Sequence, residues 1–141
     1  MLTIQRLSAD DAAILLTGAE AKAGEIGVAM CIAVVDEAGH LITFKRMDGA
    51  KQLSVRLSDD KAYTSAVSKR PTHEYNEMCR PGEPIFGIHT SSGGRFSTVA
   101  GGFPVIVDGE IVGAIGLSGG AAEQDMQCAE AGLAAFAGQG S

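Results

Sequence analysis

Three histidines and a few arginines and carboxylates are the side chains of this sequence that could do chemistry. His89 lies in the polar stretch Gly87–Ser92, and a histidine that faces a cavity can move protons near neutral pH or ligate a haem iron. His40 and His73 lie in separate segments, and none of the three has a ligand partner at helical or hairpin spacing. We therefore expect no preformed metal site. The alternative to a functional His89 is an exposed histidine with a structural role only.

A second group of charged residues follows a predicted hairpin. Arg46 at its end can hold a carboxylate through two hydrogen bonds, with Asp48 fixing its orientation, or the two side chains can simply pair with each other. The run Asp59–Lys61 and Tyr63 lie on a predicted helix. There these groups either move protons or form a solvated surface.

Glycines mark two further stretches. Ser118 and Gly119 lie between a predicted strand and a predicted helix, where free backbone N–H groups attract an anion, unless the stretch is only a tight turn that caps the helix. Gly101 and Gly102 follow a short β-rich run, where they let the backbone bend and approach a ligand. Neither glycine-rich phosphate-binding motif occurs in the sequence, so we exclude a phosphate loop.

Composition excludes some classes of partner. The 141 residues carry a formal net charge of −6 with a pI near 4.9 and show no basic stripe, which argues against a nucleic-acid partner. The N-terminus lacks a signal-peptide pattern, and no apolar run approaches the roughly 20 residues that span a membrane. We expect a cytoplasmic protein with no membrane partner, and three cysteines that are buried thiols.

The elements that position these residues follow from periodicity. Ser8 is a typical N-cap for a helix to about Ile26, and strands at 28–36 and 41–47 form a hairpin before a helix at 53–69. A short helix at 73–79 and a proline-rich loop at 80–84 lead to strands at 96–100, 103–107 and 110–117. Asp108-Gly109 predicts a type I′ turn between the last two strands. A final helix is expected at 122–136.

The resulting order, α-β-β-α-(α)-β-β-β-α, leaves too few residues for helical crossovers between strands. It predicts an α+β fold in which an antiparallel sheet carries helices on a face. No repeat or linker divides the sequence, so we expect one domain over residues 1–141.

Several stretches share a diagnostic order and spacing: Val34–Leu41, Arg46–Ala50, Lys61–Ala66, Gly101–Pro104, Val107–Gly119 and Gln124-Asp125. Through them the sequence resembles, over nearly its whole length, the GlcG/HbpS family, a haem-binding-protein-like domain also found at the C-terminal end of PduO-type proteins. The resemblance implies a five-stranded antiparallel sheet flanked by helices. It also implies a homo-oligomer, often a tetramer or octamer.

The resemblance further implies a pocket where subunits meet, lined in part by residues 85–99. In this sequence that segment contains Phe86, His89, Arg95 and Phe96. Two aromatic rings with an arginine and a histidine suit a planar, anionic ligand. Members of the family have been connected with haem or corrinoid binding, and some relatives with cofactor-free chemistry on small aromatics.

Three functions stay open at this point. The first is a protein that binds haem or a corrinoid, with His89 or another loop residue near the metal and Arg95 or Arg46 near a propionate. The second is a cofactor-free lyase or isomerase, similar to a hydroxylaminobenzoate lyase, that acts on a small aromatic or polar carboxylic acid. In it Arg46 or Arg95 binds the carboxylate, and His89, Asp48 or Lys61 moves protons. The third is an accessory oligomer without chemistry.

Overall fold

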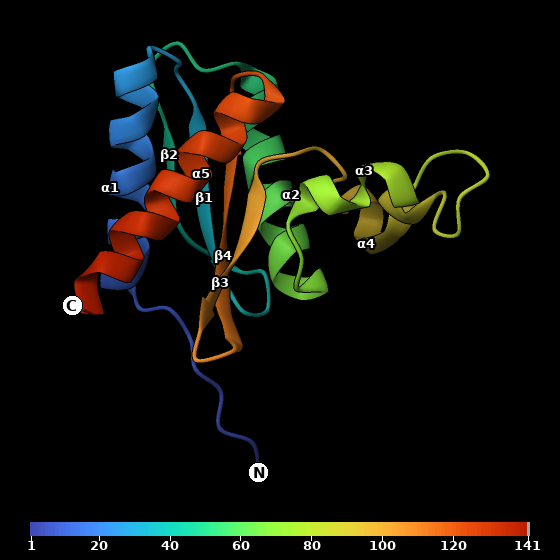
Figure 1. The fold of residues 1–141 in the computed structure, drawn as a ribbon, viewed down its shortest axis with the longest axis horizontal. Coiled ribbons are helices and arrows are strands. Elements are labelled where there is room, and N and C mark those ends of the chain that lie inside the picture. The colour runs from blue at the N-terminus through green and yellow to red at the C-terminus, as the bar shows by residue number, and fades with distance from the viewer. Residues whose placement is uncertain (141) are drawn as a thin grey trace.

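Antiparallel pairing of four strands forms the centre of the molecule (Figure 1). The computed structural model describes residues 1–140, so the expected domain end at residue 141 lies outside the described residues. The strands lie in the order β2-β1-β4-β3, and all neighbours run antiparallel. Their bounds are β1 Cys31–Asp36, β2 Leu41–Arg46, β3 Gly102–Val107 and β4 Glu110–Ser118.

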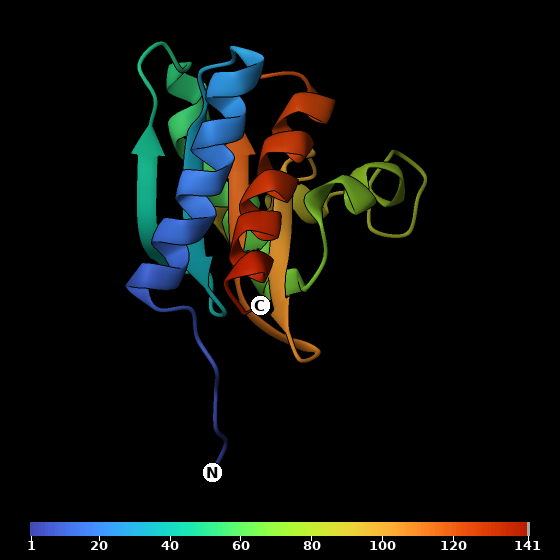
Figure 2. The ribbon, with the colours of Figure 1, turned by 60° about the vertical axis from the view of Figure 1, so that its left-hand side comes forward.

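Residues 1–140 include five α-helices: α1 Ala9–Ile26, α2 Gln52–Ser68, α3 Tyr75–Met78, α4 Ser91–Gly94 and α5 Ala122–Ala137. Figure 1 shows α3 and α4 projecting to the side of the sheet. Figure 2 shows α1 and α5 side by side on one face, with α2 on the other. Short 3₁₀ turns lie at 72–74, 88–90 and 138–140. The order α-β-β-α-α-α-β-β-α confirms the predicted α+β class. No helix within residues 1–140 has the length and apolar character needed to cross a membrane.

The expected fifth strand, at 96–100, is wrong. This segment is irregular, because side chains take the backbone groups that a strand would offer to a neighbour. The Thr64 hydroxyl accepts the Ser97 N–H at 2.8 Å, and the Ser97 hydroxyl accepts the Val99 N–H at 3.3 Å. The segment therefore follows α2 rather than the sheet.

Local signals at the other boundaries are confirmed. Ser8 caps α1 in a reciprocal capping box with Asp11, and Gly27 ends the helix in the left-handed region at φ 72°. Asp108 and Gly109 have φ values of 51° and 80°, as a type I′ turn requires. This turn sets the pairing of β3 with β4.

The two faces of the sheet carry side chains of different size. Ile32 and Val34 of β1 point into the core shared with α1 and α5, together with Leu117 of β4. Ala33 and Val35 point to the α2 side, where the buried partners include alanines of α2 and β4. Small residues let α2 approach the sheet more closely than the larger aliphatic face allows.

Gly116 marks the closest approach of α2 to the sheet. A Cβ atom at this position would lie 2.1 Å from the Ser58 carbonyl oxygen and 2.6 Å from the Ala62 backbone nitrogen. Both atoms belong to the backbone of α2, so no side-chain rotation relieves the clash. The whole helix would have to move.

We predict that Gly116→Ala lowers the free energy of unfolding by about 2 kcal/mol or more, because overpacking against a helix backbone displaces the helix. Urea unfolding followed by circular dichroism measures the change. Gly24→Ala is the matched control, since nothing lies within 4 Å of the added Cβ, and alanine favours a helix by about 0.5–1 kcal/mol. Equal urea midpoints for wild type and Gly116→Ala would contradict the packing argument.

Candidate functional site

Arg95 is held from two sides against α2. Its Nε donates to Asp60 Oδ1 at 2.9 Å, and its Nη2 lies 3.4 Å from Asp59 Oδ2. The guanidinium carbon lies 4.2 Å from the centroid of the Tyr63 ring, in cation–π contact. Among residues 1–140, Nη1 has no hydrogen-bond or ion-pair partner. The chain thus fixes the guanidinium and leaves one nitrogen for a ligand.

Thr64 fixes the backbone on both sides of this arginine. Its hydroxyl oxygen accepts the N–H of Ser97 and lies 3.2 Å from the carbonyl oxygen of Arg95. The same hydroxyl lies 2.8 Å from the carbonyl of Asp60, one turn back along α2. A single buried side chain therefore ties the segment around Arg95 to the helix that supplies its partners.

A cavity of about 330 Å³ opens beside Arg95. Its lining residues are Leu57, Asp60, His89, Gly94, Arg95, Phe96, Ser97, Thr98 and Val99. The Phe96 ring packs edge-on against Tyr75, with the centroids 4.9 Å apart. The cavity combines an arginine, an exposed imidazole, a carboxylate and apolar walls. Such a mixture of apolar surface with a few polar groups is typical of small-ligand sites.

Burial affects the acidity of Asp59, one of the two carboxylates beside Arg95. Loss of hydration raises the pKa of Asp59 above its usual value, and the Arg95 charge only partly opposes this. Oδ1 of Asp59 is buried and has no hydrogen-bond partner among the described residues. Two carboxylates face one guanidinium. Protonation of Asp59 would remove one negative charge and favour an anion at Arg95.

The structure brings three of the predicted pocket residues together and leaves one apart. His89, Arg95 and Phe96 all line the cavity. Phe86, three residues before His89, is 60% exposed and does not line it within the described part of the chain. Part of the segment expected from the resemblance to form a pocket thus does so in one copy of the chain.

Arg46 and Asp48 lie elsewhere. Arg46 is the exposed last residue of β2, paired in register with Cys31, and Asp48 is exposed in the loop that follows. Neither lines the cavity beside Arg95, as far as residues 1–140 show. Their roles in binding and proton transfer stay predictions.

Lys61 is buried between the two helical layers. Its Nζ lies 3.0 Å from Asp125 Oδ2 and donates to the Leu117 carbonyl at 2.8 Å. Both charged residues are nearly inaccessible, at 0% and 3% exposed. Burial lowers the pKa of Lys61, while the carboxylate of Asp125 acts in the opposite direction. The pair joins α2 to α5 past the end of β4, and a role of Lys61 in proton transfer stays a prediction.

Two of the predicted glycines pack closely around Lys61. A Cβ on Gly101 would lie 2.5 Å from the Leu117 carbonyl oxygen and 3.0 Å from Lys61 Nζ. A Cβ on Gly102 would lie 2.4 Å from the Lys61 carbonyl oxygen. These glycines allow β3 to begin against α2, and contact with a ligand stays a prediction.

The turn after β4 uses its polar groups within the chain. Ser118 Oγ lies 3.0 Å from Ser54 Oγ, and a Cβ on Gly119 would lie 2.5 Å from the Ala29 carbonyl oxygen. The Gly120 N–H donates to Asp125 Oδ1 at 2.9 Å. The chain's own carboxylate thus occupies a donor of the expected anion site, and ligand binding by Ser118 and Gly119 stays a prediction.

The sequence interpretation placed Thr64 and Asp125 in motif stretches but gave neither a role, although both organise this region. An acidic residue in the first turn of a helix after Gly-Gly is an available signal for Asp125, because such a carboxylate accepts backbone N–H groups there. No local pattern indicates the role of Thr64, because its hydrogen bonds reach a segment 31 and 33 residues away. For Asp60 and Tyr63 the sequence left two roles open, proton transfer or a solvated helix surface.

Comparison with known sequences identifies relatives of this chain. The family described as "Haem degrading protein HbpS-like" matches residues 7–134. An uncharacterized 15.0 kDa protein of Citrobacter freundii is 40% identical over 83% of this chain and 82% of its own length. Protein GlcG of Escherichia coli K12 is 35% identical over 79% and 81%. Corrinoid adenosyltransferase PduO of Salmonella typhimurium is 33% identical over 92% of this chain, which matches only 39% of PduO.

Solved structures show the same fold. Protein ORFY of Klebsiella pneumoniae superposes with a TM-score of 0.95 at 34% identity, covering 97% of this chain and 94% of that chain. A complex of PduOC with haem superposes with a TM-score of 0.89 at 33% identity, covering 92% of this chain and 94% of that chain. The resemblance inferred from the sequence motifs is confirmed.

We predict that Lys61→Met and Asp125→Leu each lower the free energy of unfolding by about 3–5 kcal/mol, because each leaves a buried charge without its partner. The double variant should lose clearly less than the sum of the two, measured by urea unfolding in a double-mutant cycle. Lys22→Met with Glu25→Leu is the matched control, a more exposed pair at 3.2 Å that should cost less than about 1 kcal/mol. If the losses in the free energy of unfolding for Lys61→Met and Asp125→Leu were additive, they would argue against a coupled pair.

Proposed function

The chain belongs to the HbpS-like family, related to GlcG and to the C-terminal domain of PduO, and on this premise we propose that it binds a planar anionic ligand of the haem or corrinoid type beside Arg95. The fixed guanidinium of Arg95 carries the proposal, because Asp59 and Asp60 hold its Nη2 and Nε while its Nη1 has no partner within residues 1–140. Arginine suits the carboxylate of a propionate. The haem complex of PduOC supports the ligand class.

The residues of the cavity fit one edge of a tetrapyrrole. At about 330 Å³ the cavity lies at the small end of ligand sites, so a haem would extend past it. Val99 lines the cavity and is 47% exposed, which extends the apolar surface outward. In this arrangement Arg95 would hold a propionate, Phe96 would pack on the ring and His89 would ligate the iron. A bound haem supplies a redox-active, ligand-binding iron.

We predict that purified protein shifts the Soret band of added haemin, and that His89→Ala removes most of this shift because the iron loses its imidazole ligand. The measurement is an absorbance titration, with aquocobalamin in a parallel series for the corrinoid. His40→Ala is the control, since its side chain is 81% exposed and lies outside the cavity. A spectrum of free haemin at saturation would reject the haem proposal, and equal shifts in both variants would reject His89.

A second candidate function follows from the size of the cavity. A volume of about 330 Å³ is large enough for a small aromatic acid. In a cofactor-free lyase or isomerase, Arg95 would bind the carboxylate, Phe96 would contact the ring and His89 would move the proton. Asp48 and Lys61 stay predictions as proton-transfer groups, as does a homo-oligomeric assembly for either function.

We predict that Arg95→Ala weakens binding of 4-hydroxybenzoate at least tenfold, since a hydrogen bond to a charged group contributes about 1.5–3 kcal/mol. Isothermal titration calorimetry at pH 7 gives the dissociation constants. Arg70→Ala is the matched arginine control, since Arg70 is exposed and does not line the cavity, and it should bind as wild type does. Asp59→Asn should bind more tightly, because it removes a negative charge near Arg95. Equal affinities of the two arginine variants would exclude Arg95 as the carboxylate-binding residue.

A further inference from the structure

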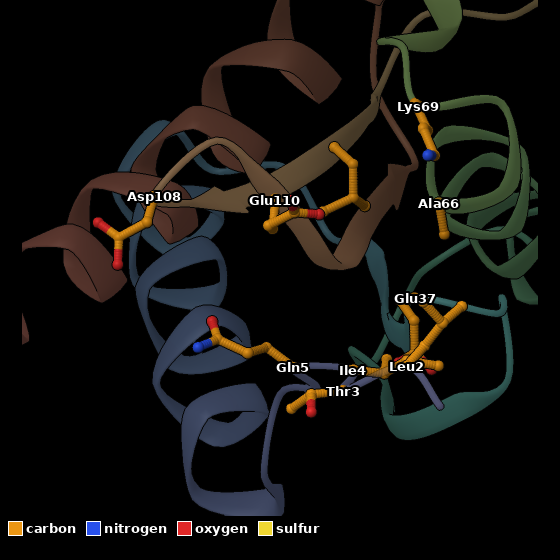
Figure 3. Close-up of a pocket in the computed structure, with 10 residues that line it drawn as sticks. Leu2, Thr3, Ile4, Gln5, Glu37, Ala66, Lys69, Asp108 and Glu110 are labelled. Carbon is orange, nitrogen blue, oxygen red and sulfur yellow. The ribbon is translucent and has the colours of Figure 1, made fainter.

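The first six residues form an arm that stands away from the domain. Figures 1 and 2 show the N-terminal segment leaving the lower end of the fold without folding back. Leu2 is 92% exposed and Ile4 is 63% exposed. A cavity of about 630 Å³ lies between the arm, the end of α2 and the turn after β3, and Figure 3 shows Leu2 and Ile4 on its arm side. Two large apolar side chains of the arm thus have little contact with their own domain.

The root of this arm is firmly attached. Arg6 Nε donates to Glu37 Oε2 at 2.8 Å, and the Leu7 N–H donates to the Val112 carbonyl at 3.1 Å. Leu7 itself is buried at 4% exposed. The arm therefore leaves the domain from a fixed point, and an extended segment of six residues reaches about 20 Å from it.

An apolar groove begins near this root. One part, of about 640 Å³, is lined by Pro104, Val105, Ile106, Val107, Leu133, Phe136, Ala137 and Gln139 of β3 and the end of α5. Its neighbour, of about 320 Å³, shares Val107 and Phe136 and includes Gln5, Arg6 and Leu7. The groove thus runs from the root of the arm along the edge strand β3. Ile106, which follows a register shift in β3, is 58% exposed on it.

We infer that the N-terminal arm of one copy of this chain binds in the apolar groove between β3 and α5 of a second copy, with Leu2 and Ile4 as its anchors. Alternate residues of an extended segment point the same way, so both anchors can enter one groove. Each arm leaves its own domain beside its own groove. A two-fold axis near the roots would therefore exchange both arms in one self-complementary contact.

The exchange predicts a crosslink between chains. A tagged Ile4→Cys copy and an untagged Ile106→Cys copy, both in a Cys79→Ser background, are mixed and treated with a short bismaleimide. Cys31 and Cys128 are buried and should not react. We expect a tagged–untagged conjugate on a denaturing gel. Thr17→Cys on the exposed side of α1 replaces Ile106→Cys in the control and should give none. No conjugate from the Ile4–Ile106 mixture, or equal yield from the control, would overturn the inference.

The anchors can also be removed without touching the core. The variant Leu2→Ser/Ile4→Ser should weaken self-association at least tenfold in sedimentation velocity, with an unchanged circular dichroism spectrum. Thr3→Ala/Gln5→Ala alters the opposite side of the arm and should leave the association constant unchanged. An unaltered profile for the serine variant would overturn the role of the anchors. Ligand binding beside Arg95 involves other residues, so a failure here leaves the proposed function intact.

Discussion

The ion pair of Lys61 with Asp125 is the contact on which the arrangement of the layers depends. The sheet separates α2 from α1 and α5, and this pair links the two sides where β4 ends. Its hydrogen bond to the Leu117 carbonyl adds the sheet to the same network. Because both charges are buried, the pair is stable only if the two groups and their hydrogen-bond partners are closely and accurately placed. Gly101 leaves room for this arrangement, since a Cβ atom at this position would lie 3.0 Å from Lys61 Nζ.

The position of the candidate site follows from this network. Lys61 faces the interior, so Asp60 and Tyr63 on the same helix are directed to the other side, where Arg95 lies. Thr64 then ties the segment of Arg95 to the helix. A helix fixed on its inner side by packing and an ion pair provides rigid support for polar side chains on its outer side.

The sequence predicts most of the fold because its strongest signals are local. The N-cap at Ser8 and the Asp108-Gly109 turn act within a few residues, and the structure confirms both. The strand expected at 96–100 failed because a distant hydroxyl, that of Thr64, takes the backbone N–H of Ser97. The candidate site was predicted only in part, because its side chains are held by contacts between distant segments. The polar stretch around His89 and the pocket segment implied by the family resemblance indicate His89 and Arg95, whereas the partners of Arg95 on α2 depend on contacts between residues about 30 positions apart.

The small residues beneath α2 tolerate fewer substitutions than the segment that carries the candidate site. Where Ala33, Ala62 and Gly116 set the spacing between helix and sheet, almost every substitution adds volume to a space that has none. The segment from 79 to 99 has no such neighbour in the sheet and is attached mainly through the partners of Arg95 and Ser97. We therefore expect insertions and replacements there to disturb the core less than substitutions beneath α2. Divergence of ligand preference among proteins of this fold is therefore expected to concentrate in that segment, while the helix that supports it stays constant.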